Sequence, residues 1–267
     1  MCANHVSLKG FCIELFKFYF LDYVIVMRFN NKVVLVTGAS QGIGAAIAIK
    51  HATEGAKVAV VGRNREKLAD VVKKCGNSAL AIAADVTKEE ECKRIINETV
   101  ARFGKIDVLI NNAGIIDKVS IEEDRALEVY DKIMNTNVRS VVCLTNLAVP
   151  HLIKSKGNIV NISSIAALSV KAGKGGFAYS ASKAAVDHFG RCIALDLAPY
   201  GIRVNTVNPG PVKTDIMGNS GMSDYNDDTP WEGMRQMTLL KRVSEPKEIA
   251  ELAFLIVVCD FVNKLNE

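Results

Sequence analysis

The fold is decided by Val33-Val-Leu-Val-Thr-Gly-Ala-Ser-Gln-Gly-Ile-Gly44, close to the start of a chain of 267 residues. The first four residues form a continuous apolar run, typical of a strand buried on both faces of a parallel sheet. Helical periodicity then runs over residues 42–54. A strand, closely spaced glycines and a helix together favour phosphate binding, because the turn is tight and the helix N-terminus presents N–H groups and a positive dipole. The spacing differs from G-x-G-x-x-G, so a purely structural turn is the alternative at this point.

The same alternation of strand and helix continues along the chain. Short apolar or alternating runs predict strands at residues 58–61, 79–83, 108–110, 158–162 and 202–207. Helical patterns lie at residues 65–74, 88–103, 122–154, 179–198 and near 246–258. Strands and helices at this spacing imply right-handed crossovers, so we predict an α/β fold with a Rossmann-like, doubly wound parallel sheet. No linker-like tract and no internal repeat interrupts the pattern, which favours a single domain.

Composition excludes several classes of protein. The chain is 49% hydrophobic and 23% charged, as in ordinary globular proteins. Its net charge of +4 is small and its lysines are scattered, so we expect no nucleic-acid partner. Seven cysteines without a Cys-x-x-Cys pair indicate a reducing compartment, and we predict the cytoplasm. The four histidines are too dispersed to predict a metal site.

The first 27 residues differ in character from the rest. Residues 11–27 are rich in aromatic and β-branched side chains, but Glu14, Lys17 and Asp22 interrupt a run shorter than the ~20 residues needed to span a bilayer. A secretory signal fits poorly, since no small-residue cleavage site follows. We therefore expect residues 1–27 to be an extension and residues 28–267 to be the functional domain, with a membrane anchor as the less favoured alternative.

Reactive side chains gather in the second half of the chain. Tyr179 and Lys183 are four residues apart on a predicted helix and therefore share one face. Ser164 follows the strand predicted at residues 158–162. A tyrosine pKa near 10 must fall by roughly 3 units for proton exchange at neutral pH. The surroundings must therefore stabilise the phenolate by ~4 kcal/mol relative to the phenol. A nearby ammonium group in a desolvated site can supply much of this.

These motifs together resemble the short-chain dehydrogenase/reductase family. The resemblance covers about residues 32–251 and is most like the 3-oxoacyl-carrier-protein reductase type, on the evidence of Arg63 and of residues 240–250. Its motifs occur in the family order: the glycine turn, Asp85-Val86, Asn111-Asn-Ala-Gly114, Asn137, Ser164, Tyr179, Lys183 and Asn208-Pro-Gly210.

The resemblance implies an enzyme that interconverts a ketone and a secondary alcohol without a metal. Tyr179 would be the proton donor or acceptor, and Lys183 would lower its pKa and hold the nicotinamide ribose. Ser164 would polarise the substrate carbonyl, so Ser164 and Tyr179 are also the expected substrate contacts. Ser163 is a rival for Ser164. Asn137 would hold a water that links Lys183 to solvent, and Asn135 is its less favoured rival.

The residue after the second strand bears on the choice of coenzyme. Enzymes that bind NAD usually carry an acid there, but this chain has Gly62 followed by Arg63. A guanidinium can hold a 2′-phosphate through charge-assisted hydrogen bonds, so we expect NADP(H), with NAD less favoured. Gln41 departs from this pattern, since phosphate-preferring relatives often carry a basic residue at that position. A solvated surface charge is the plain alternative for Arg63.

The remaining coenzyme contacts follow from the resemblance. Asp85 and Val86 would meet the adenine, although Asp85 or Thr87 could instead cap the next helix. Val212 and Thr214 would contact the nicotinamide amide. The full expected set is Gly38, Ser40, Gln41, Gly42, Ile43, Gly44, Arg63, Asp85, Val86, Asn112, Ala113, Gly114, Tyr179, Lys183, Pro209, Gly210, Val212 and Thr214.

Two segments bear on substrate and assembly. Residues 215–237 are expected to form a mobile lid, in which Met217, Met222, Trp231, Met234 and Met237 could line an apolar pocket. Residues 259–267 lack the final strand that relatives carry, which would expose a sheet edge and make a homo-oligomer doubtful. The expected partner is a small carbonyl or alcohol. The alternative function is a weak or inactive relative that serves as a binding or scaffold protein.

Overall fold

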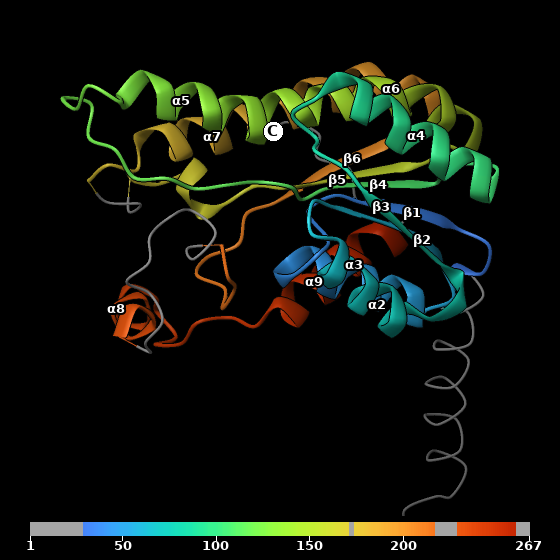
Figure 1. Cartoon of the computed structure of the whole chain (residues 1–267), viewed down its shortest axis with the longest axis horizontal. Helices are drawn as coiled ribbons and strands as arrows, with labels where there is room; N and C mark the ends of the chain where they lie inside the picture. The colour runs from blue at the N-terminus through green and yellow to red at the C-terminus, as the bar shows by residue number, and fades with distance from the viewer. Residues whose placement is uncertain (1–28, 171–173, 217–228, 260–267) are drawn as a thin grey trace, which may run out of the picture.

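The chain folds around one parallel β-sheet (Figure 1). A computed structural model describes residues 29–170, 174–216 and 229–259. Within them the sheet has six strands in the order β3-β2-β1-β4-β5-β6. The strands are β1 (Val33–Val36), β2 (Lys57–Gly62), β3 (Ala79–Ala83), β4 (Val108–Asn111), β5 (Asn158–Ile162) and β6 (Arg203–Val207). The order reverses between β1 and β4, which is where ligands bind in open sheets of this kind.

Helices cover both faces of the sheet (Figure 1). On one face lie α2 (Gly42–Thr53), α3 (Arg65–Cys75) and α9 (Pro246–Val258), and on the other α4 (Glu89–Phe103), α6 (Ser140–Ser155) and α7 (Phe177–Leu197). Each face has its own apolar core, and the alternating side chains of β1 divide between the two: Val34 and Val36 join the first, and Leu35 joins the second. This packing confirms the doubly wound fold, which the buried apolar strands predict.

The structure confirms the predicted strands to within one residue at each end. The prediction of one long helix over residues 122–154 is wrong in two respects. Residues 121–125 form turns, and α5 (Ala126–Met134) is joined to α6 by a π-helical turn, Asn135–Arg139. A π turn inserts one extra residue without breaking the helix, and such turns recur at functional sites.

Some sequence predictions fall outside the described residues. These are the extension at residues 1–27 and the altered C-terminus beyond Cys259. Across the three described ranges, no helix combines the length and apolar character needed to cross a membrane.

Candidate active site

The turn after β1 is shaped by glycines that could not carry a side chain. Gly38 and Gly42 have φ angles of +61° and +58°, a region that favours glycine. A Cβ on Gly38 would lie 2.8 Å from Ala113 Cα, and one on Gly44 would lie 2.5 Å from Gly38 O. The turn therefore packs directly on the residues that follow β4, at the switch point of the sheet.

The N-terminus of α2 suits an anion. Gln41 is the N-cap, but its side chain makes no capping hydrogen bond, and the first turn contains no acidic residue. The N–H groups of Gly42, Ile43 and Gly44 therefore remain available to a phosphate, together with the helix dipole. A groove formed by glycines beside an uncapped helix N-terminus fits the pyrophosphate of a nicotinamide dinucleotide.

Asn112 ties the ends of β1 and β4 together. Its side-chain amide donates to Thr37 O at 2.8 Å and to Gly38 O at 3.1 Å. The Thr37 hydroxyl in turn accepts from the backbone N–H groups of Asn112 and Ala113, each at 3.0 Å. The predicted residues Asn112, Ala113 and Gly114 thus lie beside the glycine turn.

Asp85 closes a turn rather than capping α4. It accepts from the Thr87 backbone N–H at 3.0 Å and from the Thr87 hydroxyl at 2.8 Å. Partial burial opposes ionisation, but these bonds and the charge of Arg63 hold the pKa of Asp85 below its ordinary value. The N-cap of α4 is Lys88, so the capping role considered for Asp85 or Thr87 is wrong. Val86 is buried next to them.

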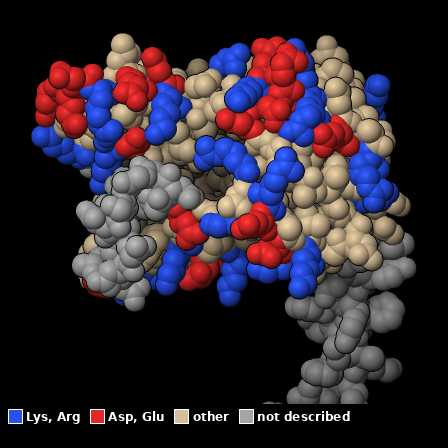
Figure 2. Space-filling model, in the orientation of Figure 1, with Lys and Arg blue, Asp and Glu red and all other residues tan. Residues whose placement is uncertain are grey.

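A basic side chain missed by the sequence reasoning lies near Gln41. Lys67 Nζ donates to the Gln41 side-chain oxygen and forms an ion pair with Asp215 at 3.8 Å. Arg63 is exposed at the end of β2. The space-filling view is hollowed near the middle of this face, with Lys and Arg side chains on the rim (Figure 2). Lys67 stands one helical turn beyond Arg63, but nothing in the sequence pattern places it against Gln41.

Asn137 lies in the π turn and links three segments. Its Oδ1 accepts from Ile115 N at 2.8 Å, and its Nδ2 donates to Ile115 O at 2.9 Å and to Ser182 Oγ at 3.0 Å. Ser182 Oγ donates to Tyr179 O at 2.7 Å. Asn137, rather than Asn135, is therefore the residue that connects the loop after β4 to α7.

Lys183 is buried against the end of β5. Its Nζ donates to Ile162 O at 2.9 Å, and a Cβ on Gly114 would lie 3.4 Å from this nitrogen. Burial lowers the pKa of Lys183 to about 8, and the nearby Asp187 acts in the opposite direction. Ser163 Oγ donates to Lys183 O at 3.0 Å, so the hydroxyl of Ser163 is committed to the α7 backbone.

Ser164 and Tyr179 share a side-chain hydrogen bond. Ser164 Oγ also accepts from Ala166 N at 3.1 Å, which orients the hydroxyl. Burial raises the pKa of Tyr179, and the bond to Ser164 only partly offsets this. The structure therefore does not show the expected fall in the pKa of the phenol, because burial outweighs the contacts that favour phenolate.

The turn after β6 completes the edge of the site. Ile165 N donates to Pro209 O at 2.9 Å, so this turn is tied to the segment that carries Ser164. Buried Val212 forms a bridge with Ser244, and Gly210 is exposed. A Cβ on Gly42 would lie 3.2 Å from Thr214 Cγ2, so Thr214 reaches the glycine turn. The structure thus places Thr214 at the glycine turn and Pro209 beside the segment that carries Ser164.

The lid prediction is only partly covered by the described residues. Trp231 and Met234 on α8 (Thr229–Met237) are half-buried and Met237 is exposed. Met217 and Met222 lie outside the described residues. Figure 1 places α8 at the same end of the molecule as the carboxyl ends of the strands.

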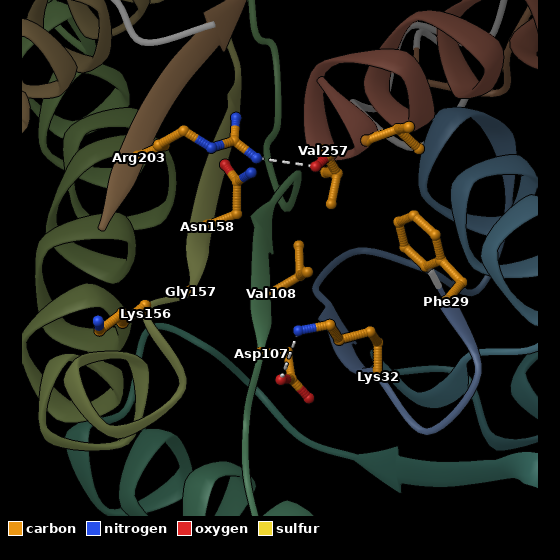
Figure 3. A pocket seen from close by; sticks show the side chains of 10 residues that line it. Phe29, Lys32, Asp107, Val108, Lys156, Gly157, Asn158, Arg203 and Val257 are labelled. Atoms are coloured by element: carbon orange, nitrogen blue, oxygen red, sulfur yellow. Dashed lines mark hydrogen bonds and ion pairs between the residues drawn. The ribbon is translucent and has the colours of Figure 1, made fainter. Parts of the chain in front are cut away.

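A cavity of about 270 Å³ lies at the opposite end of the sheet (Figure 3). It is lined by Lys32, Asp107, Asn158 and Arg203 at the amino ends of the strands. None of the predicted site residues lines it. Within the three described ranges, no group of three or more His, Cys, Asp or Glu side chains is placed to hold a metal ion.

Comparisons with known proteins agree with this geometry. Residues 32–224 match the family model described as short chain dehydrogenase. The meso-2,3-butanediol dehydrogenase of Serratia marcescens is 35% identical over 90% of this chain and 93% of that enzyme. A short-chain dehydrogenase/reductase of unknown function from Caenorhabditis elegans, solved with its cofactor, is 37% identical, with a TM-score of 0.81 over 86% of this chain and 89% of that one. The 3-ketoacyl-(acyl-carrier-protein) reductase of Brucella melitensis, complexed with NADH, is 29% identical, with a TM-score of 0.79 over 89% and 96% of the two chains.

Proposed function

Because this chain belongs to the short-chain dehydrogenase/reductase family and is an NAD(P)-dependent oxidoreductase acting on CH–OH groups, we propose that it interconverts a ketone and a secondary alcohol with NADP(H). We assign the proton transfer to Tyr179. The observation that carries the proposal is the convergence of Ser164, Tyr179 and Lys183. Asn137 supports this group through its hydrogen bond to Ser182 on the same helix. A scaffold role is not favoured, since it would not require this convergence.

The coenzyme, when bound, supplies or accepts the hydride at its nicotinamide ring. Ser164 holds the carbonyl oxygen through its hydroxyl and stabilises the charge that develops there. Tyr179 donates its phenolic proton to the same oxygen during reduction and takes it back during oxidation. The raised pKa of Tyr179 keeps the phenol protonated at neutral pH, which suits it to the reductive direction.

Lys183 acts on Tyr179 through its charge. With a pKa of about 8 the ammonium group is largely protonated at pH 7. At 5.8 Å from the ring centre, and with an effective dielectric constant of ~20, a unit charge stabilises phenolate by roughly 3 kcal/mol, or about two pKa units. The raised pKa of Tyr179 indicates that burial outweighs this attraction in the structure, so the charge of Lys183 reduces the cost of forming phenolate without removing it.

The finer assignments are also part of the proposal. Arg63 favours NADP(H) over NAD(H), although the Brucella relative was solved with NADH. The acyl-carrier-protein reductase subtype and a cytoplasmic location stay predictions. Residues 28–267 are proposed as one catalytic unit and residues 1–27 as an extension.

The test is turnover by Tyr179→Phe. Purified protein is screened with NADPH and NADH against diketones, quinones, steroids and acyl thioesters, and the variant is assayed on the best substrate. We expect at least a thousandfold loss of kcat with unchanged NADPH fluorescence on binding. Tyr200→Phe, at an exposed residue beyond α7, is the matched control and keeps full activity. Undiminished turnover by Tyr179→Phe would refute the mechanism.

A further inference from the structure

Lys67 lies in the first turn of α3, just beyond the end of β2. Asn64 caps this helix by accepting from Lys67 N at 2.9 Å. Since Arg63 immediately precedes the cap, Arg63 and Lys67 leave the same turn. The start of α3 therefore sets the positions of two cations next to the end of β2.

The side chain of Lys67 reaches back over the turn that follows β1. Its Nζ donates to the Gln41 side chain, and Gln41 is the N-cap of α2. Lys67 thus places a positive charge beside Gln41, whose own side chain is uncharged. Its side chain is 45% exposed, so this charge is accessible to a ligand.

The end of β2 carries no acid, although Glu66 is exposed in the first turn of α3. Gly62 ends β2, and a Cβ there would lie 3.2 Å from Ser40 Oγ. The Ser40 hydroxyl therefore lies beside the end of β2, and the guanidinium of Arg63 and the ammonium group of Lys67 belong to the turn that follows this strand. A phosphate monoester, with three acceptor oxygens and up to two negative charges, matches this donor set better than a neutral ribose hydroxyl does.

Each cation has an acidic neighbour in the structure. The charge of Arg63 contributes to lowering the pKa of Asp85, and Lys67 forms an ion pair with Asp215 at 3.8 Å. Asp215 follows Thr214, which contacts the glycine turn. A phosphate placed between the cations would compete with Asp215 for Lys67.

We propose that Lys67 is a second specificity-determining cation for the coenzyme, which binds the 2′-phosphate of NADP(H) together with Arg63 and Ser40. The inference rests on the proposed preference for NADP(H). It adds that Gln41 positions Lys67 and that Asp215 weakens binding of the phosphate.

The test compares two ligands that differ only in the phosphate concerned. Adenosine 2′,5′-bisphosphate and adenosine 5′-monophosphate are titrated by calorimetry into the full chain and its variants. For Lys67→Gln we expect roughly a tenfold loss of affinity for the bisphosphate, the size of one charge-assisted hydrogen bond, and less than a twofold change for the monophosphate. Lys73→Gln, an exposed residue of the same helix, is the matched control and leaves both affinities unchanged.

Asp215→Asn supplies the opposite change. Removing its charge should tighten binding of the bisphosphate about threefold without affecting the monophosphate, and Lys67→Gln should abolish that gain. A merely structural role for Lys67 would instead lower both affinities equally, or lower the melting temperature while leaving the ratio of affinities unchanged, and either result overturns the inference.

The two proposals fail in different ways. If the wild type binds the bisphosphate no more tightly than the monophosphate, the NADP(H) preference itself is wrong. If the wild type prefers the bisphosphate and Arg63→Gln removes that preference while Lys67→Gln does not, only the role of Lys67 is wrong.

Discussion

Acid should destabilise this protein through one buried histidine, His51 on α2. The His51 side chain is 0% exposed and packs edge-on against the rings of Phe29 and Phe254. Its Nδ1 is hydrogen-bonded to Ile47 O at 2.8 Å, and Nε2 has no hydrogen-bond partner among the residues that the structure describes. Burial, with a smaller contribution from the charge of Lys50, lowers its pKa from 6.5 to about 4.

The sign and size of the effect follow from linkage. Between pH 6.5 and 4 the unfolded chain binds a proton at His51 that the folded protein does not, so stability falls as the pH decreases through this window. The change from 6.5 to about 4 corresponds to about 3 kcal/mol in full, and at pH 5 about 2 kcal/mol is already lost relative to pH 7.5. Below pH 4 this contribution is constant.

The assay is the free energy of unfolding from urea titrations at pH 7.5, 6 and 5. His51→Leu removes the titration, and it should abolish the loss of about 2 kcal/mol while changing stability at pH 7.5 by less than about 1.5 kcal/mol. His151→Gln is the control, because His151 is only partly buried and its pKa is lowered less. If the wild type and His51→Leu lose equal stability between pH 7.5 and pH 5, the reasoning is refuted.

Three further predictions concern the active site. Gly44→Ala should abolish NADPH binding, measured by fluorescence, because its Cβ would lie 2.5 Å from Gly38 O; Gly233→Ala, with nothing within 4 Å, should bind normally, and tight binding by Gly44→Ala would contradict the geometry of the turn. Lys183→Met should move the pH profile of alcohol oxidation upward by about one to two units, since the ammonium charge near Tyr179 is removed; an unshifted profile would exclude that electrostatic role. Asn137→Ala should lower the melting temperature and reduce kcat more than NADPH affinity, because three buried or partly buried hydrogen bonds to Ile115 and Ser182 are lost, and a variant with wild-type kcat would show that this link is dispensable.

The fold could be predicted from sequence because its strands are buried on both faces. The apolar run at Val33–Val36 is fully buried, and such runs are bounded by turn residues that make them easy to recognise. The predicted coenzyme residues also gather at one edge, because the carboxyl ends of parallel strands meet there. Local pattern was sufficient for both.

Local pattern was insufficient where contacts between distant segments decide. The π turn at Asn135–Arg139 leaves the helical periodicity of the sequence almost unchanged, so nothing in the pattern indicates it. Lys67 reads as a surface lysine until α3 and α2 are placed side by side. The raised pKa of Tyr179 depends on burial that only the folded chain provides.

The arrangement separates the chemistry from the choice of substrate. Tyr179 is positioned through Ser182, Asn137 and Ile115, a chain of hydrogen bonds that joins α7, the π turn and the loop after β4. Apolar side chains are instead exposed on the segments around this framework, with Val170 94% exposed after Ser164 and Leu239 100% exposed after α8. Changes in those segments should therefore alter KM among carbonyl compounds more than the pH profile, which the buried network controls.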